Sequence, residues 1–335
     1  VLHPTLHHLE LQLLMRSSIL PLLAVAALLT ACTKDITVDL PTTDPKLVVE
    51  GTIEIGGPPL VILTRTQSYF DPTDLNSIAS IFVKDAVITV SDGITTVPLL
   101  QICSSAIPDS LIDEAAALTG LDAELLANAD ICIYTLLDNS FLGVEGRTYS
   151  LNIDAGGELA SSVTSIPYAV PLDSLWFRLA QQQPDDDSLG FIYATLTDPD
   201  TMGNAYRWFA KRINEDENGD QKDDQFIAPL FSVFEDRYIN ALTFDFNFNR
   251  GSSPYSSDED DENEEAGYFK RGDTVVVKFV SIGIPEFQFY NTYANNVASQ
   301  GDLFSTPANA RTNISGGLGV WAGYAQAIDT VVCVP

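Results

Sequence analysis

Short runs of apolar and β-branched residues recur along this chain of 335 residues, and Gly, Pro, Asp and Asn separate them. Such runs are typical of β-strands, and the residues between them are typical of turns. The candidate strands are 46–55, 59–66, 81–92, 95–100, 131–137, 149–154, 174–180, 191–198, 205–213, 226–234, 241–248 and 273–282. Many short strands at regular spacing favour β-sandwiches, so we expect a mainly β protein with two sandwich-like, immunoglobulin-like domains.

An extended stretch with two prolines, residues 161–177, separates two groups of strands. Chains often divide into domains at stretches of this kind. We therefore expect an N-terminal β domain at 46–166 and a C-terminal β domain with acidic loops at 167–335. The polar stretch 32–45 also contains two prolines and is expected to be a tether in front of the first domain.

Two segments have helical composition. Residues 108–130 contain the sequences SLIDEAAAL and DAELLANA, and an Asp or Ser stands before each as a candidate N-cap. We expect a helical insertion here, between two strands of the first domain. Residues 285–300 begin with Pro285 and then place aromatic residues close to helical spacing. This pattern predicts one amphipathic helix packed on a sheet near the C-terminus.

Cys103 and Cys132 flank the helical insertion. In an oxidising compartment a disulfide between them would close the base of the insertion and stabilise the fold by roughly 3–4 kcal/mol. The alternative is a pair of buried free thiols. Cys333 has no obvious partner and is expected to be a thiol in a C-terminal strand.

We expect residues 1–31 to be a stretch upstream of the protein followed by an export signal. Met15 is the expected first residue of the translated protein. Arg16 supplies a positive charge, and the apolar run 19–29 is shorter than the ~20 residues that span a bilayer. Cys32 then completes the Leu-x-Ala-Cys pattern of a bacterial lipobox. We expect its thiol to carry diacylglycerol, because two or three acyl chains anchor a protein stably. The alternative is an ordinary secretory signal with a chance cysteine.

All three histidines, His3, His7 and His8, precede Cys32, so the expected mature chain has none. This excludes Ser-His-Asp and Cys-His catalysis and His-ligated zinc or iron. The formal net charge of −29 argues against nucleic acid as a partner, because phosphate binding requires basic patches. These features do not exclude an enzyme that hydrolyses its substrate with a pair of carboxylates. With 46 Asp and Glu residues, no spacing selects a pair, and we expect a protein that is not an enzyme.

The stretch INEDENGDQKDDQ, residues 213–225, is a candidate calcium loop. Its oxygen-bearing side chains alternate, and Gly219 follows them as in an EF-hand loop, but Gln225 stands where that loop needs Glu. The candidate ligands, which include those of a shifted register, are Asn214, Asp216, Asn218, Asp220 and Asp224. The alternative is a solvated hairpin tip without an ion, so Ca²⁺ is the one cofactor that the sequence suggests.

For three further features we weigh a functional interpretation against a structural one. Arg271-Gly272-Asp273 resembles an adhesion motif, but a turn is needed before the strand that follows. The acidic run 256–267 is expected to be a flexible surface loop, with cation or partner docking as the alternative. Tryptophans and tyrosines could form a stacking platform for sugar or peptide, or simply the sandwich core. These aromatic residues are Trp176, Trp208, Trp321, Tyr206 and Tyr324.

Four stretches carry a resemblance to a known family. They are CTKDITVDLPTTDPKLVVEGTI, LTDPDTMGNAYRWFAKR, KRGDTVVVKFVSI and FYNTYANNVASQGDLFSTPANARTNISGGLGVWAGYA. Together they resemble the Bacteroidota lipoproteins grouped as domain of unknown function 4249, from about Cys32 to the C-terminus. The ending TNISGGLGVWAGY after a Tyr-rich helix is the most specific piece. The resemblance implies an outer-membrane lipoprotein with an accessory role in the cell envelope, and it supplies no catalytic residues.

From these features we expect a lipid-anchored outer-membrane protein, facing the cell surface, that works with a TonB-dependent outer-membrane barrel in nutrient binding or uptake. Lys34-Asp35 after the lipobox cysteine resembles a surface-export signal, although Ile36 interrupts it. The first alternative is a free-standing surface module or adhesin that binds glycans or proteins, stiffened by calcium. The second alternative is a carboxylate-based hydrolase.

Overall fold

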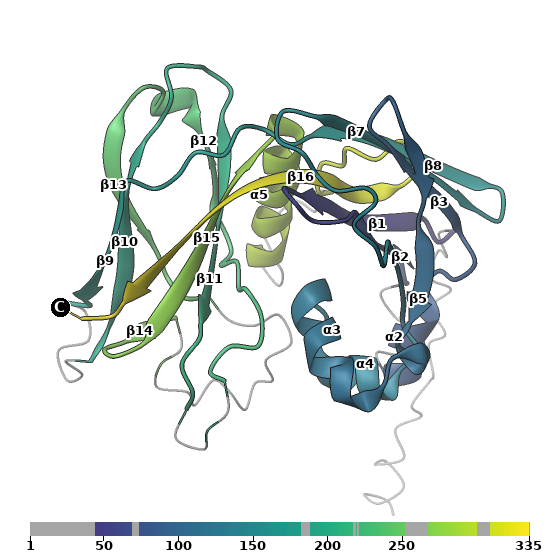
Figure 1. Cartoon of the computed structure of the whole chain (residues 1–335), viewed down its shortest axis with the longest axis horizontal. Coiled ribbons are helices and arrows are strands. Elements are labelled where there is room, and N and C mark those ends of the chain that lie inside the picture. Colours follow the sequence, from purple (N-terminus) through teal and green to yellow (C-terminus); the bar gives the residue numbers. More distant parts are fainter. Residues whose placement is uncertain are drawn as a thin grey trace, which may run out of the picture. The chain divides into compact units, whose positions relative to one another are not determined.

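The computed structural model describes residues 44–68, 74–181, 188–216, 219, 221–251, 265, 267–299 and 309–334, all within the compact unit Asp44–Pro335. Strands dominate this part of the chain, and a few helices accompany them (Figure 1). The prediction of a mainly β fold is therefore confirmed.

The largest sheet in the described part has eight strands in the order β12-β11-β15-β16-β1-β2-β6-β5. All neighbours in it are antiparallel except β1 and β16. The strands are β12 (Val233–Glu235), β11 (Ala205–Arg212), β15 (Thr274–Ile282), β16 (Leu318–Val332), β1 (Leu47–Glu54), β2 (Leu60–Arg65), β6 (Cys132–Thr135) and β5 (Leu100–Cys103).

The described residues form two smaller sheets as well. In the first, the order is β4-β3-β7-β8, and in the second it is β13-β10-β14, with β9 also paired to β10. The strands of the first are β4 (Thr96–Pro98), β3 (Val87–Ser91), β7 (Thr148–Ala155) and β8 (Glu158–Ser165). Those of the second are β13 (Thr243–Phe248), β10 (Leu189–Thr197), β14 (Phe269–Lys270) and β9 (Ser174–Leu179).

Each smaller sheet shares a hydrophobic core with part of the large sheet, which gives two sandwich-like halves. The first core joins Leu63 and Trp321 of the large sheet to Leu151 of β7. The second joins Trp208 of the large sheet to Ile192 of β10. Every second residue of these strands points inward, as expected for sheets with one covered face. Burying one such aliphatic or aromatic side chain contributes about 1.5–3 kcal/mol.

The long strand β16, the yellow arrow in Figure 1, takes part in both sandwich-like halves. Its first part pairs in parallel with β1, and its second part pairs antiparallel with β15. Trp321 and Ala325 accordingly belong to the first core and Val331 to the second. The predicted domain boundary between residues 166 and 167 separates most strands of the two cores, but the C-terminal strand crosses it.

The helices are α2 (Leu75–Ile81), α3 (Ile112–Thr119), α4 (Ala123–Asn128) and α5 (Ile284–Ala298). Short 3-10 turns lie at Ser104–Ala106, Asp109–Leu111 and Asp236–Tyr238. The predicted helical insertion is present as α3 and α4. Asp122 caps α4, because its carboxylate accepts a hydrogen bond from the Leu125 amide at 2.7 Å. Pro285 stands in the first turn of α5, as predicted, and α5 packs on the large sheet.

Three local predictions were incomplete. The strand predicted at 226–234 contains only the start of β12, with an isolated bridge at Ile227, because Pro229 cannot donate to a ladder. Helix α2 was not predicted; Asp74 caps it by accepting from the Ser77 amide at 2.8 Å. Strand β8 was not predicted either, because Ser and Thr dominate its sequence and hide the alternation.

Candidate functional site

Cys32 and the signal segment lie outside the described residues, so the lipid anchor stays a prediction. Within the described part, none of the helices has the length and hydropathy to cross a membrane.

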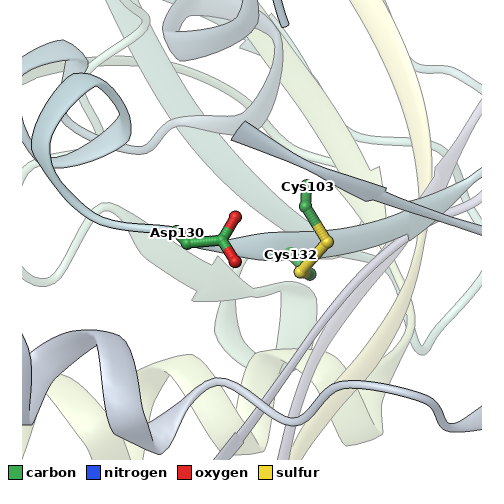
Figure 2. Close-up of side chains that lie close together, drawn as sticks. All are labelled: Cys103, Asp130 and Cys132. Carbon is green, nitrogen blue, oxygen red and sulfur yellow. A yellow bond between two sulfur atoms is a disulfide. The ribbon is translucent and has the colours of Figure 1, made fainter. Parts of the chain in front are cut away.

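The structure contains a disulfide between Cys103 and Cys132, which stand opposite each other in β5 and β6. Figure 2 shows the carboxylate of Asp130 pointing toward it, and Asp130 accepts from Lys84 Nζ at 2.6 Å. The three groups are close enough for a shared metal ion. The two sulfurs are bonded to each other, however, whereas metals bind free thiolates, so these residues do not form a metal site. The disulfide instead closes the base of the helical insertion.

The predicted calcium loop is only partly described, since Asn218 and Asp220 lie outside the described residues. The Asn214 side chain accepts from the Thr274 amide at 3.2 Å and donates to Asp273 at 3.2 Å. The Asp224 backbone carbonyl accepts from Lys211 Nζ at 2.7 Å. Asn214 thus holds the base of a hairpin, and calcium binding at this loop stays a prediction.

A buried group of charges lies beside this hairpin. Arg212 and Asp223, each with a side chain 4% exposed, form an ion pair at 2.7 Å. Lys222 pairs with Asp273 at 2.9 Å, and Arg212 also pairs with Glu265 at 2.7 Å. Each carboxylate already has a cation, so the group fits a structural role. Because the Asp273 side chain is only 2% exposed, the Arg271-Gly272-Asp273 sequence does not present it for adhesion.

The tryptophans of the predicted stacking platform are not together. Trp208, Trp321 and Tyr206 are fully buried in the two cores. Trp176 on β9 instead stacks on Tyr193 of β10, with ring centroids 5.7 Å apart, and both are half-buried.

A second polar group was not predicted as a group, although it contains Tyr324 of the predicted stacking platform. We call it the Arg207 cluster and define it as Glu50 of β1, Arg207 of β11, Tyr290 of α5 and Tyr324 of β16. Arg207 Nη1 donates to the Tyr324 hydroxyl at 2.7 Å, and the hydroxyls of Tyr290 and Tyr324 lie 2.6 Å apart. The guanidinium also lies over the Tyr290 ring, 3.6 Å from its centroid.

Strand alternation brings these residues to the face of the large sheet that carries α5. Glu50 pairs with Val320 and Arg207 with Val280, and Val280 packs in the same group as Tyr324 and α5. The opposite face carries Trp208 and the two sandwich cores. The Arg207 cluster therefore lies outside both cores.

The electrostatics of the cluster are unusual for a surface. The Glu50 side chain reaches solvent. The protein packed around it still removes part of its hydration and so raises the pKa of its carboxyl, and the Arg207 charge offsets part of that rise. Burial also holds the pKa values of Tyr290 and Tyr324 above the ordinary value, so both hydroxyls stay protonated at neutral pH.

Neighbouring charges differ in their pairing. Glu54, two residues beyond Glu50 on β1, pairs with Lys278 Nζ at 2.9 Å. Among the described residues the Arg207 side chain makes one hydrogen bond, to a neutral hydroxyl, and no ion pair, and the Glu50 side chain makes neither. Perturbed, unpaired charges of this kind gather at functional sites more often than elsewhere.

A pocket of about 380 Å³ lies elsewhere, and Arg65, Phe82, Lys84, Asp85 and Gly156 are among its lining residues. Its cations already have partners: Arg65 pairs with Glu158 at 2.7 Å and Lys84 with Asp130 at 2.6 Å. The Arg207 cluster is therefore the stronger candidate site.

The comparisons with known proteins give a family. The family described as Domain of unknown function (DUF4249) matches residues 33–329. The chain belongs to this family. No curated protein matches it. Among solved structures, the chain is similar to the cycloalternan-degrading enzyme from Trueperella pyogenes in complex with cycloalternan, with 7% identity and a TM-score of 0.22. The similarity covers 84% of this chain and 34% of the enzyme, so the chain spans about a third of that length, and it supports no conclusion about fold or activity.

The ending TNISGGLGVWAGY, on which the resemblance to DUF4249 chiefly rested, has a structural role. The Asn313 amide bonds both backbone groups of Trp321, at 2.8 and 2.9 Å. Gly319 has a φ of +102°, and a Cβ there would collide with the Val49 carbonyl oxygen. These residues let β16 approach β1 closely. Tyr324, the last residue of this short sequence, belongs to the Arg207 cluster.

Proposed function

We propose that this DUF4249 protein is a lipid-anchored accessory protein of the outer membrane that binds a ligand and works with a TonB-dependent transporter in nutrient uptake. The observation that carries the proposal is the Arg207 cluster. It combines an arginine that forms no ion pair with any described residue, an exposed carboxylate and two tyrosine hydroxyls at the junction of four elements. The lipobox at Cys32 supports the location.

The chemistry of the cluster favours binding over catalysis. A nucleophile needs an adjacent base or a lowered pKa, whereas the pKa values of Tyr290 and Tyr324 are raised. The cluster contains no histidine, and no carboxylate of the described residues is bonded to Glu50. Fixed donors and acceptors of this kind suit recognition.

The lipid anchor can be tested directly. Cells that express the full chain are labelled with radioactive palmitate and then fractionated. We expect label on the wild-type protein in the membrane fraction, and an unlabelled, soluble Cys32→Ala variant. Cys333→Ser, which removes a cysteine elsewhere, should keep the label. Label that persists in Cys32→Ala would contradict lipidation at this residue.

The transporter partnership is tested by affinity purification of the tagged, lipidated chain from native outer membranes in mild detergent. We expect a TonB-dependent receptor to accompany it in comparable amounts and to be depleted with Cys32→Ala. Repeated purification without any receptor would refute the partnership.

A free-standing glycan-binding module is the second candidate function. The observation that favours it is the half-buried Trp176–Tyr193 pair on the outer side of the β9–β10 sheet, because sugars stack on such rings. A glycan array with wild type and Trp176→Ala tests it. Binding without any transporter, lost in Trp176→Ala, would support this function.

A further inference from the structure

We propose that the Arg207 cluster binds the carboxylate group of a small organic ligand that also carries a hydrogen-bond donor. This inference rests on the proposed binding function and names the chemical class of its ligand.

The position of the Arg207 guanidinium prepares it for an anion. It contacts two aromatic rings, with its central carbon 3.6 Å from the Tyr290 centroid and 4.6 Å from that of Phe209. Within the described part of the chain, one of its five N–H donors is used, toward Tyr324. A guanidinium fixed in this way, with donors left over, matches the two oxygens of a carboxylate.

The surroundings favour a singly charged carboxylate over a phosphate. Glu50 and Glu54 lie on the same face of the sheet, and the whole chain has a formal net charge of −29. Both repel a dianion more strongly than a monoanion. Lys278, another cation on this face, is already paired with Glu54 at 2.9 Å.

Glu50 supplies the second half of the recognition. Its carboxylate is exposed and has no hydrogen-bond or ion-pair partner among the described residues. It can accept from an ammonium or a hydroxyl of the ligand. Two kinds of ligand have this chemistry: short peptides, which carry an ammonium group, and sugar acids, which carry hydroxyls.

The experiment is a calorimetric titration of the purified full-length chain in detergent with two probes, trialanine and galacturonate. We expect saturable binding of at least one probe. Arg207→Gln should weaken it by about tenfold or more, and Arg207→Lys by less, because lysine keeps the charge but lacks the planar fork. Arg237→Gln changes an exposed arginine that pairs with Glu235; it is the matched control and should bind as the wild type does.

Glu50→Gln provides a test at an exposed position, with a side chain of nearly the same shape. It should weaken trialanine, whose ammonium loses a charged partner, and leave galacturonate equal or tighter, because a repulsive charge is removed. The ratio of the two affinities therefore identifies the ligand type. Thermal melting of each variant accompanies the titrations.

Three results would overturn the inference: no saturable binding of either probe, unchanged binding in Arg207→Gln, or an unchanged affinity ratio in Glu50→Gln. If the chain still co-purifies with a receptor, such results refute the ligand class alone. If no receptor co-purifies but the probes bind, the transporter partnership fails and the ligand class stands.

Discussion

Glu286 lies in the first turn of α5 and is only 2% exposed. Its carboxylate accepts from the Thr164 hydroxyl at 2.6 Å and from the Asn313 amide at 3.3 Å. Burial raises the pKa of this carboxyl, and the two hydrogen bonds offset only part of the rise. Glu286 therefore joins α5 to β8 and to the segment before β16, at an electrostatic cost that depends on pH.

Glu286→Gln should become more stable relative to wild type as the pH rises from about 4.5. The unfolded carboxyl loses its proton near 4.5, whereas the folded one keeps it to higher pH. Wild type therefore loses stability as the pH rises through that window, and the glutamine variant does not. Urea unfolding from about pH 4 to pH 8 measures this. Glu114→Gln, on the exposed side of α3, is the control, and parallel pH profiles for Glu286→Gln and wild type would contradict the prediction.

The Cys333 thiol should be unreactive in the folded protein. It is fully buried, and burial together with the Asp273 charge raises its pKa to about 12. Thiolate is the reactive form, so almost none is present at neutral pH. In a Cys32→Ala chain, Ellman's reagent should detect no thiol before unfolding and one after it. Rapid reaction of the native protein would show that this strand end opens readily.

At the scale of elements, the approach of β16 to β1 depends on Gly319. Gly319→Ala should destabilise the fold by about 1–3 kcal/mol or more, because the methyl group meets backbone and the φ is unfavourable. Gly93→Ala is the matched control: its φ is +85°, but a Cβ there meets nothing within 4 Å. Urea unfolding of both variants separates collision from strain. Equal losses would mean that β1 and β16 can move apart.

The disulfide between Cys103 and Cys132 should stabilise the helical insertion. It closes a loop with a sequence separation of 29 residues. The double variant Cys103→Ser, Cys132→Ser should lose roughly 3–4 kcal/mol in the chain-entropy model. Reductant should destabilise wild type by a similar amount and leave the double variant unchanged. Hydrogen exchange should locate the loss in α3 and α4, and an unaffected wild type in reductant would contradict a stabilising disulfide.

At the scale of the whole molecule, the shared strand β16 should make the two sandwich-like halves unfold together. Leu63→Ala, in the first core, should cost about 2–5 kcal/mol. Hydrogen exchange in β10, which lines only the second core, should accelerate together with that in β1. Exchange that changes in β1 alone would show two independent domains.

The sequence predicted most strands, because alternating apolar residues report a covered face wherever one side of a strand meets water. It missed β8, where Ser and Thr fill the alternation, and α2, which is short. It identified Cys103 and Cys132 as a candidate pair because they flank one inserted segment. Its interpretation of Arg271-Gly272-Asp273 as a turn agrees with the burial of Asp273.

The Arg207 cluster could not be predicted in this way. Its members, at positions 50, 207, 290 and 324, come from four elements, and each looks ordinary in its own segment. Arg207 is a polar residue in an aromatic strand, and Glu50 is one of many acidic residues. Local patterns in the sequence determined the β character, the helical segments and the ending TNISGGLGVWAGY, which carries the family resemblance. Only the tertiary structure decided which strand is shared and which charges meet unpaired, because both depend on pairings between segments far apart in the chain.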